Sequence, residues 1–419
     1  MKTIILKEII KNNRVIIKNF SFLTILQLFL LLSPLITFPY LIRVLGKDCY
    51  GVIITAQVIV SYFSLIIEFG TNGVCAKYVS INRDNKEVLS EIVCSILSLK
   101  FILFLISFFV YSVIVFVVPN YHSHWCLFLL MYSLTFNELL FPQYYFQGME
   151  RMGIITTLNI VFKLVFIFLI FVFIKDGDDY ILMPIFYGLG HLFVGLTSLC
   201  IIFKKDKLCF HIPNPDIILK YVKEAGVIFT TDIITTIKDK LNYLLIGRYV
   251  SMGDVVVYDL SIKINGFIVR PVNILATVLF PRFAKERNVH KLRKSIILSL
   301  LSVLCLVLFV NIFMEQISYF FLHEKVDTIP LRLFSLAPVF LSISYMIGYN
   351  YLLAFGHNKV LLNSIIVTTG VYLIALAALF VLNIENNLYS FIYVAIISYL
   401  SELIYRMYKT IKLIKTNEK

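Results

Sequence analysis

Charged residues are scarce in this chain of 419 residues. Asp, Glu, Lys and Arg together make up 15% of it, whereas apolar residues make up 59%. A soluble protein of this length needs more polar surface than that, so the solvent around most of the chain must be lipid. Tryptophan occurs once, while the 37 Phe and 25 Tyr residues suit lipid-facing and interfacial positions.

Motifs for catalysis, nucleotide binding and metal binding are also missing. The seven Cys residues are scattered without CxxC or Cys/His ligand spacing, and the chain has neither a GxxxxGK[ST] motif nor a nucleophile elbow. His122 and His124 form an HxH pair, but two imidazoles without a third ligand are typical of solvated loop residues. We therefore expect no enzyme, no ATPase, no metal and no cofactor.

Apolar stretches recur along the whole chain. A helix needs about 20 mostly apolar residues to cross a bilayer, and twelve stretches meet or approach this length. The predicted fold is therefore all-α, a polytopic membrane protein with 12 transmembrane helices in two pseudo-symmetric six-helix halves around a central cavity. The predicted spans are 20–41, 52–74, 93–118, 125–147, 154–174, 180–203, 225–249, 255–281, 295–314, 331–354, 360–383 and 388–406.

The basic residues predict the orientation. Of the 38 Lys and Arg residues, 26 fall on the two ends and one alternate set of loops, and 5 on the other set. Cytoplasmic loops carry the excess of Lys and Arg, so both termini are expected in the cytoplasm of a bacterial inner membrane. The net charge of +13 then reflects topology and membrane lipids rather than nucleic acid. The basic first 19 residues lead into an apolar run too long for a signal peptide, which predicts an uncleaved anchor.

The segment 225–249 is the least apolar of the twelve. It carries Asp232, Lys238, Asp239, Lys240 and Arg248. If it did not cross the membrane, the basic residues after it would lie outside, against the charge rule. We therefore expect it to span, with its charged face turned toward partner helices or water.

Two short patterns repeat at six-helix spacing. Arg43 and Asp48 precede the second span as Arg248 and Asp254 precede the eighth, at offsets of 205 and 206, and Gly148 recurs as Gly356 at 208. The nearly constant offset favours a duplication over coincidence. It predicts an N-terminal half over 1–210 and a C-terminal half over 211–419, with a binding site between them.

Several motifs resemble those of the polysaccharide-export flippases, the Wzx-type translocases of O-antigen or capsule repeat units, within the multidrug/oligosaccharidyl-lipid/polysaccharide exporter superfamily. The resemblance covers about residues 20–290 and is most specific in the first half. Departures such as Glu68, where the family usually has Asp, affect specificity rather than class. The motifs are Phe38-Pro39-Tyr40-Leu41, Arg43, Leu45-Gly46, Tyr50-Gly51, Tyr62-Phe63-Ser64-Leu65, Glu68-Phe69-Gly70, Phe141-Pro142, Phe146-Gln147-Gly148, Asn242, Tyr258 and Phe280-Pro281.

The resemblance implies a substrate and a direction. Members of this family move undecaprenyl-diphosphate-linked oligosaccharides from the cytoplasmic to the outer leaflet by alternating access. Expected partners are that lipid-linked substrate, membrane lipids, a polysaccharide polymerase and a chain-length regulator. A diphosphate with sugars cannot cross about 30 Å of hydrocarbon without a polar lining.

Cations at membrane depth are the candidate substrate-binding residues. Each costs roughly 2.5 to more than 10 kcal/mol there, so it needs a cavity or a partner. Arg270 and Lys263 lie two turns apart on one helical face and form the first candidate site for the diphosphate. The other candidates are Lys238, Lys240, Lys163 and Arg43.

Each of these cations also has a structural interpretation. Asp232, Asp239 and Asp259 would pair with Lys238, Lys240 and Lys263 in an ionic seam between the seventh and eighth helices. Arg43 would serve as an interfacial anchor, and Lys163 would be structural. Lys100 and Arg332 lie near predicted helix ends, where their side chains would reach the interface.

Carboxylates within the spans are candidates for ion coupling. A membrane carboxylate that takes up H⁺ or Na⁺ could couple cation uptake to export. Glu138 is the first candidate because it lies in mid-helix beside Asn137 without an adjacent base. Glu68, Asp232 and Asp239 are the others.

Three other functions remain open. A multidrug or other lipid exporter of the same superfamily would share the fold, although midplane cations favour an anionic substrate. A repeat-unit polymerase or ligase would be expected to have a large outer loop, whereas the longest here is 315–330. A channel would need neither the repeat nor the buried charges.

Overall fold

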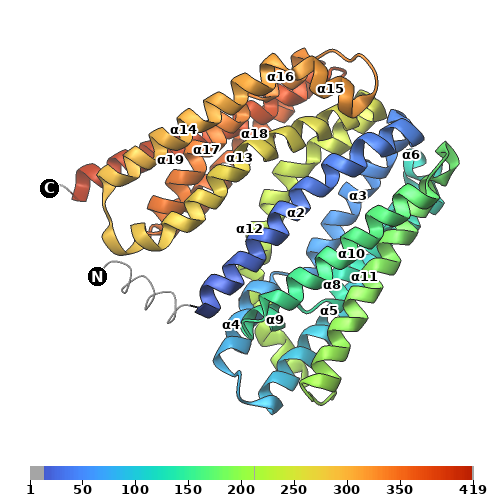
Figure 1. Ribbon diagram of the computed structural model, residues 1–419, viewed down its shortest axis with the longest axis vertical. Helices are drawn as coiled ribbons and strands as arrows, with labels where there is room; N and C mark the ends of the chain where they lie inside the picture. The colour runs from blue at the N-terminus through green and yellow to red at the C-terminus, as the bar shows by residue number, and fades with distance from the viewer. Residues whose placement is uncertain (1–13, 212, 418–419) are drawn as a thin grey trace. The chain divides into compact units, whose positions relative to one another are not determined.

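Helices account for the regular structure throughout the described part of the chain. The computed structural model describes residues 14–211 and 213–417, which contain helices and no strand. Eleven of the helical segments there are long and apolar enough to cross a membrane. The predicted all-α, polytopic membrane fold is confirmed. The ribbon is shown in Figure 1.

The polar segment 225–249 forms part of one continuous helix, α12. This helix runs from Pro215 to Tyr249 but is not among the eleven apolar spans, as its charges predict. We therefore keep α12 as the expected twelfth span.

Contacts divide the chain into two compact units. Among the described residues, the first comprises 14–45 and 56–233, and the second comprises 46–55 and 234–417. Helices α3 (Lys47–Glu68) and α12 therefore contribute to both. The expected halves 1–210 and 211–419, and the symmetry between them, remain predictions.

Helices α10 and α11 connect most of the first unit. Helix α10 packs against α2 and α11, α11 also packs against α8, and α4 packs against α9. Lipid-facing positions carry large apolar side chains, such as Phe109, which is 71% exposed. Besides parts of α3 and α12, its helices are α2 (Arg14–Leu45), α4 (Thr71–Ile81), α5 (Lys86–Val117), α6 (Pro119–His122), α7 (Trp125–Met131), α8 (Phe136–Leu140), α9 (Gln143–Gly148), α10 (Met152–Phe173) and α11 (Leu182–Cys200).

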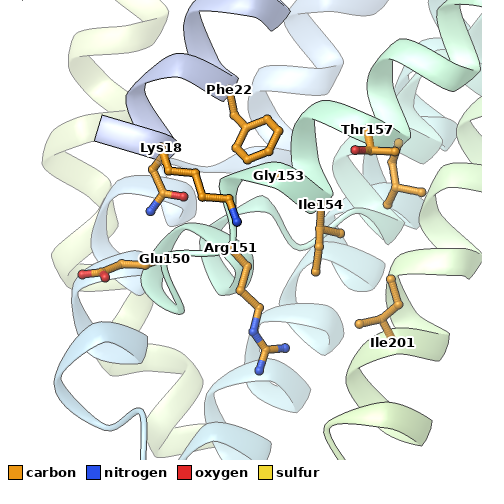
Figure 2. Close-up of a pocket in the computed structure, with 10 residues that line it drawn as sticks. Lys18, Phe22, Glu150, Arg151, Gly153, Ile154, Thr157 and Ile201 are labelled. Carbon is orange, nitrogen blue, oxygen red and sulfur yellow. The ribbon is translucent and has the colours of Figure 1, made fainter. Parts of the chain in front are cut away.

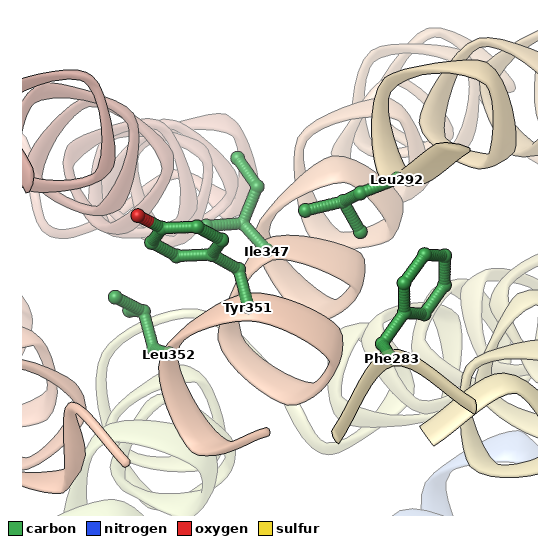
Figure 3. Packing of buried hydrophobic residues seen from close by; sticks show 5 residues of the cluster. All are labelled: Phe283, Leu292, Ile347, Tyr351 and Leu352. Atoms are coloured by element: carbon green, nitrogen blue, oxygen red, sulfur yellow. The ribbon is translucent and has the colours of Figure 1, made fainter. Parts of the chain in front are cut away.

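The second unit is organised around α17. This helix packs against α13, α14 and α19, and α18 packs along α19. A hydrophobic cluster holds these helices near one end: Phe283, Leu292, Ile347, Tyr351 and Leu352 are at most 5% exposed (Figure 3). The helices are α13 (Met252–Glu286), α14 (Val289–Ile312), α15 (Met314–Leu322), α16 (Ile329–Phe334), α17 (Ala337–Ile347), α18 (Asn358–Val381) and α19 (Leu388–Asn417).

Several predicted spans are not single helices, and 331–354, for example, is divided into α16, α17 and a π-helical turn over 348–353. The predicted span 52–74 is interrupted because Phe69 and Gly70 have positive φ angles, 49° and 68°, and α4 starts afresh at Thr71. The predicted span 125–147 is divided into α7, a 3₁₀ turn over 132–135, α8 and α9. Its sharpest break is at Phe141, which is extended as expected for a residue before proline.

Close packing of α4 on α9 depends on Gly148. A Cβ atom at this position would lie 2.6 Å from Cβ of Val79 and 2.8 Å from the main-chain oxygen of Ala76. Gly148→Ala should therefore destabilise the protein by about 1–3 kcal/mol through overpacking. The measurement is thermal unfolding of the purified protein in detergent. Gly370→Ala is the control, since a Cβ there meets no atom within 4 Å; equal effects of the two substitutions would contradict the prediction.

Candidate functional site

A cavity of about 290 Å³ with both apolar and charged lining residues lies within the second unit, between α13, α17 and α19. We call it the Arg270 cavity. Its walls combine amides, aromatic rings and charges, which is the composition expected of a site that binds a polar ligand. The lining residues are Ile262, Asn265, Gly266, Val269, Arg270, Asn273, Leu341, Tyr345, Tyr399, Glu402 and Arg406.

Local sequence positions α13 along this cavity. The side chain of Ser251 caps the helix by accepting a hydrogen bond from the main-chain N–H of Asp254. Further along, Nδ2 of Asn265 donates to the main-chain oxygen of Phe334 at 3.0 Å, which ties α13 to the end of α16. The second contact anchors α13 to α16 in the part of the helix that precedes Arg270 and Asn273.

Three buried polar atoms of the lining residues have no hydrogen-bond partner among the described residues. They are Nε of Arg270 and the Oδ1 atoms of Asn265 and Asn273. Arg270 also forms no ion pair in the described part of the chain. Buried polar groups are nearly always paired, so these three residues are unusual members of the cavity lining.

Glu402 joins two cations beside the cavity. Its Oε1 lies 2.7 Å from Nη1 of Arg406, and its Oε2 lies 3.4 Å from Nζ of Lys238 on α12. Arg406 also donates to the main-chain oxygen of Ser344 at 3.1 Å and to Oγ of Ser364 at 3.0 Å. Glu402 and Arg406 thus link α12, α17, α18 and α19 to one another.

Sequence reasoning missed Glu402 and misplaced Arg406. It did not single out Glu402, and it counted Arg406 with the cytoplasmic tail, whereas Arg406 is 8% exposed within α19. The available signal was an acid and a base four residues apart in an otherwise apolar run, a spacing that pairs side chains on a helix.

Of the predicted seam, the pairing of Asp259 with Lys263 is confirmed, but no ion pair in the described structure joins the seventh and eighth helices. Lys263 does pair with Asp259, but both lie on α13. Lys238 pairs with its neighbour Asp239 at 3.7 Å, and its link to another helix is to Glu402 on α19.

The remaining charges of this region are divided between the two units. Lys263 and Arg270 lie on one helix, but Lys263 is not part of the cavity lining. Lys240 is half-buried on α12, and Asp239 is exposed. Asp232, also half-buried, belongs to the first unit.

Lys163 and Arg43 lie in the first unit. Nζ of Lys163 lies over the rings of Phe166 and Tyr187, with distances of 5.1 and 5.6 Å to the ring centroids, which is a favourable cation–π geometry. Arg43 is exposed near the end of α2.

Lys100 was expected to reach the interface from a helix end, and this expectation is wrong. The side chain is 1% exposed in the interior of α5. Nζ donates to the main-chain oxygen of Glu138 at 3.0 Å and lies 5.7 Å from the ring centroid of Tyr144. Glu138 has no base adjacent in the sequence, but its main-chain oxygen is reached by Lys100 from α5.

The other acid candidates in the first unit have defined local roles. Glu68 binds the start of α4. Its two carboxylate oxygens accept hydrogen bonds from the main-chain N–H groups of Gly70 and Asn72, both at 2.8 Å, groups that have no partner within the helix. The carboxylate of Glu138 accepts from Nδ2 of Asn137 at 2.9 Å.

A second cavity, of about 590 Å³, lies in the first unit between α2, α10 and the π-helical turn after α11. In Figure 2, Lys18 and Phe22 extend from α2 toward the start of α10 at Gly153. Its Arg151 is bound at 2.7 and 2.8 Å by the two carboxylate oxygens of Asp206. Asp206 thus compensates Arg151, whereas Lys18 forms no ion pair in the described part of the chain and lies 5.9 Å from the ring centroid of Phe22.

Two bacterial proteins, each named "Putative O-antigen transporter", are similar to parts of this chain. The one from Escherichia coli (strain K12) is 26% identical over 185 residues, which are 44% of this chain and 45% of that protein. The one from Shigella dysenteriae is 24% identical over 264 residues, which are 61% and 64%. The aligned part of the chain thus spans less than two thirds of either relative.

Solved structures of low sequence identity share the fold. An inward-facing multidrug resistance MATE family transporter of the MOP superfamily superposes with a TM-score of 0.71 at 17% identity, over 92% of this chain and 96% of that one. A MOP superfamily transporter from Pyrococcus furiosus, described by the reverse polarity of its binding pocket, gives 0.59 at 15% identity, over 96% and 94%. These likenesses establish the architecture.

Residues 16–286 match the family described as "Polysaccharide biosynthesis protein". This range covers more than half of the chain and nearly coincides with the residues whose motifs resemble the polysaccharide-export proteins. The chain therefore belongs to the polysaccharide biosynthesis protein family.

Proposed function

We propose that this protein is a flippase that moves undecaprenyl-diphosphate-linked oligosaccharide repeat units, of O-antigen or capsule, from the cytoplasmic to the outer leaflet by alternating access. It would act in the bacterial inner membrane with both termini in the cytoplasm, as a transporter rather than an enzyme. Family membership and the names of the two relatives support this class of substrate.

The Arg270 cavity is the observation that carries the proposal. Glu402 is its only lining carboxylate and is already shared by Arg406 and Lys238. Arg270 therefore remains as a cation without a carboxylate partner in the described structure. Its planar guanidinium presents several donors that suit phosphate oxygens, so the cavity favours an anionic head group.

An exporter of drugs or other lipids is the alternative, and the fold shared with a multidrug MATE transporter supports it. A cationic drug would be repelled by the unpaired guanidinium. The composition of the cavity therefore favours the diphosphate.

Ion coupling and protein partners complete the proposal. Moving one charge through 100 mV yields about 2.3 kcal/mol, enough to bias alternating access through H⁺ or Na⁺. Glu138 remains the first coupling candidate, because its carboxylate forms no ion pair in the described structure and accepts a hydrogen bond from the neutral amide of Asn137. A polymerase and a chain-length regulator would act on the exported unit.

Loss of Arg270 should block export. Cells that lack the gene should accumulate complete undecaprenyl-linked repeat units on the cytoplasmic side and lose surface polysaccharide, because the substrate is made but not moved. Wild type should rescue both defects and Arg270→Ala should not, since a hydrogen bond to a charged group contributes about 1.5–3 kcal/mol. Extracted lipid-linked sugars and surface polysaccharide are measured at matched protein levels.

Arg332→Ala is the matched control for this experiment. Arg332 is a half-exposed cation of the same unit, bound to the main-chain oxygen of Asn311 at 3.0 Å, and lies outside the cavity. The Arg332→Ala variant should rescue export. Normal polysaccharide without accumulation in the deletion strain would contradict the flippase and favour the drug exporter.

Glu402→Gln should destabilise the second unit. It removes the carboxylate shared by Lys238 and Arg406, and breaking a buried ion pair costs about 3–5 kcal/mol. Adding Lys238→Met should recover part of the loss, because one uncompensated cation is removed. Thermal unfolding of the single and double variants in detergent measures both effects; strictly additive losses would contradict the shared-carboxylate interpretation.

Reporter fusions should place the loop after α12 outside. Alkaline phosphatase joined after Met252 should be active, and after Asn288 inactive, because the basic residues that follow α13 favour the cytoplasm. Activity of each fusion in intact cells is the measurement. The reverse pattern would mean that α12 does not cross the membrane.

A further inference from the structure

The cavity of about 590 Å³ in the first unit lies where three apolar spans end. We call it the Lys18 cavity. Lys18 lies just before the apolar part of α2, Arg151 lies just before α10, and Ile201 lies at the end of the span that contains α11. Apolar spans end where the hydrocarbon of the bilayer meets the head groups. The cavity therefore crosses this boundary, at the end of the unit that we propose to be cytoplasmic.

The walls of the Lys18 cavity are mostly apolar. Figure 2 shows Phe22 on α2 and Ile154 on α10 beside it, and Leu158 extends the wall one turn further along α10. A Cβ atom at Gly153 would lie 3.1 Å from Cε2 of Phe22, so the two helices approach closely at this end. The volume lies within the range of about 300–1,000 Å³ that is typical of ligand pockets. A slot with such walls, next to the hydrocarbon of the membrane, suits an acyl chain.

The polar end of the cavity carries a cation without a carboxylate partner. Lys18 is exposed and forms no ion pair in the described part of the chain. The carboxylates at this end are already paired, Glu150 with Arg83 and Asp206 with Arg151, both at 2.7 Å. Lys18 therefore keeps an uncompensated positive charge, which favours an anionic group beside it.

Two further cations lie within one turn of Ile201. Lys204 and Lys205 are exposed on the π-helical turn over 201–205 and form no ion pair among the described residues. Lysines at this boundary are expected from the orientation of the chain alone. Here, however, Lys18 borders an apolar slot, and basic pockets between membrane helices on the cytoplasmic side bind the head groups of anionic lipids. One molecule with an anionic head and an apolar chain can occupy both parts.

We propose that the Lys18 cavity binds one anionic phospholipid of the cytoplasmic leaflet. Lys18 contacts the phosphate of the head group, and an acyl chain lies along Phe22, Ile154 and Leu158. The lipid fills the space between the starts of α2 and α10 and so stabilises the first unit. This site is distinct from the Arg270 cavity, which belongs to the second unit, and its occupant is a lipid of the membrane rather than the exported one.

Native mass spectrometry of the purified full chain tests the site. Phosphatidylglycerol, which carries a net negative charge, and phosphatidylethanolamine, which carries none, are added with identical acyl chains, and the affinity for the first bound lipid is measured. Wild type should prefer phosphatidylglycerol about fivefold, the contribution of one lysine at an anionic membrane surface. Lys18→Gln should lose most of this preference and keep its affinity for phosphatidylethanolamine.

Lys77→Gln is the matched control for the charge. Lys77 is exposed on α4 in the same unit and forms no ion pair in the described structure, but it does not line the Lys18 cavity. This variant should keep the wild-type preference. Equal binding of the two lipids by wild type, or equal losses in Lys18→Gln and Lys77→Gln, would overturn the contact between Lys18 and the phosphate.

Thr157→Trp tests the apolar part of the cavity. Thr157 lines the cavity from α10 but is exposed, so a large ring at this position should fill the slot without disturbing the packing of the helices. The affinity for both lipids should fall, about fourfold for each methylene group that the ring displaces. Unchanged affinity would overturn the position of the acyl chain.

Rescue of the deletion strain separates this site from the proposed function. At matched protein levels, Lys18→Gln should still restore surface polysaccharide, because Lys18 holds a membrane lipid and not the substrate. A failure to restore it would overturn a stabilising membrane lipid as the occupant, in favour of the lipid-linked substrate. Arg270→Ala should show the opposite pattern, with the lipid preference kept and export lost.

Discussion

The structure of the second unit depends on keeping buried charges paired where water is excluded. Glu402 serves two cations at once, Arg406 on its own helix and Lys238 on α12. Removing one member of such a group leaves a charge whose desolvation is no longer offset. Because Arg406 also binds Ser344 and Ser364, the same group sets how α17 and α18 pack on α19.

Against this background Arg270 is exceptional. The neighbouring charges form ion pairs with one another. The guanidinium of Arg270 therefore dominates the electrostatic field at the cavity. Asn265 and Asn273, each with an unpaired Oδ1 in the described structure, line the same cavity. Stability would be better served by apolar residues there, since unpaired buried groups are costly. Such a cost is typical of a site that is completed by its ligand.

The first unit shows how backbone breaks create contacts that a list of spans does not contain. Pro142 and the 3₁₀ turn divide the fourth span, and the main-chain oxygen of Glu138 then reaches Lys100. Counting from predicted helix ends placed Lys100 at the interface, whereas it is buried in the interior of α5. Glu68 similarly uses its carboxylate to start α4 after the break at Gly70.

The sequence by itself determined the helical spans, the membrane environment, the family and the presence of cations such as Arg270 at depth. These follow from local composition, because each span must be apolar along its own length. Tertiary structure decided which charges pair. Lys238 binds Glu402, which lies 164 positions away, and Arg270 instead lines a cavity with two amides. Pairing depends on helix rotation and packing across the unit, and neither is encoded in the composition of one segment.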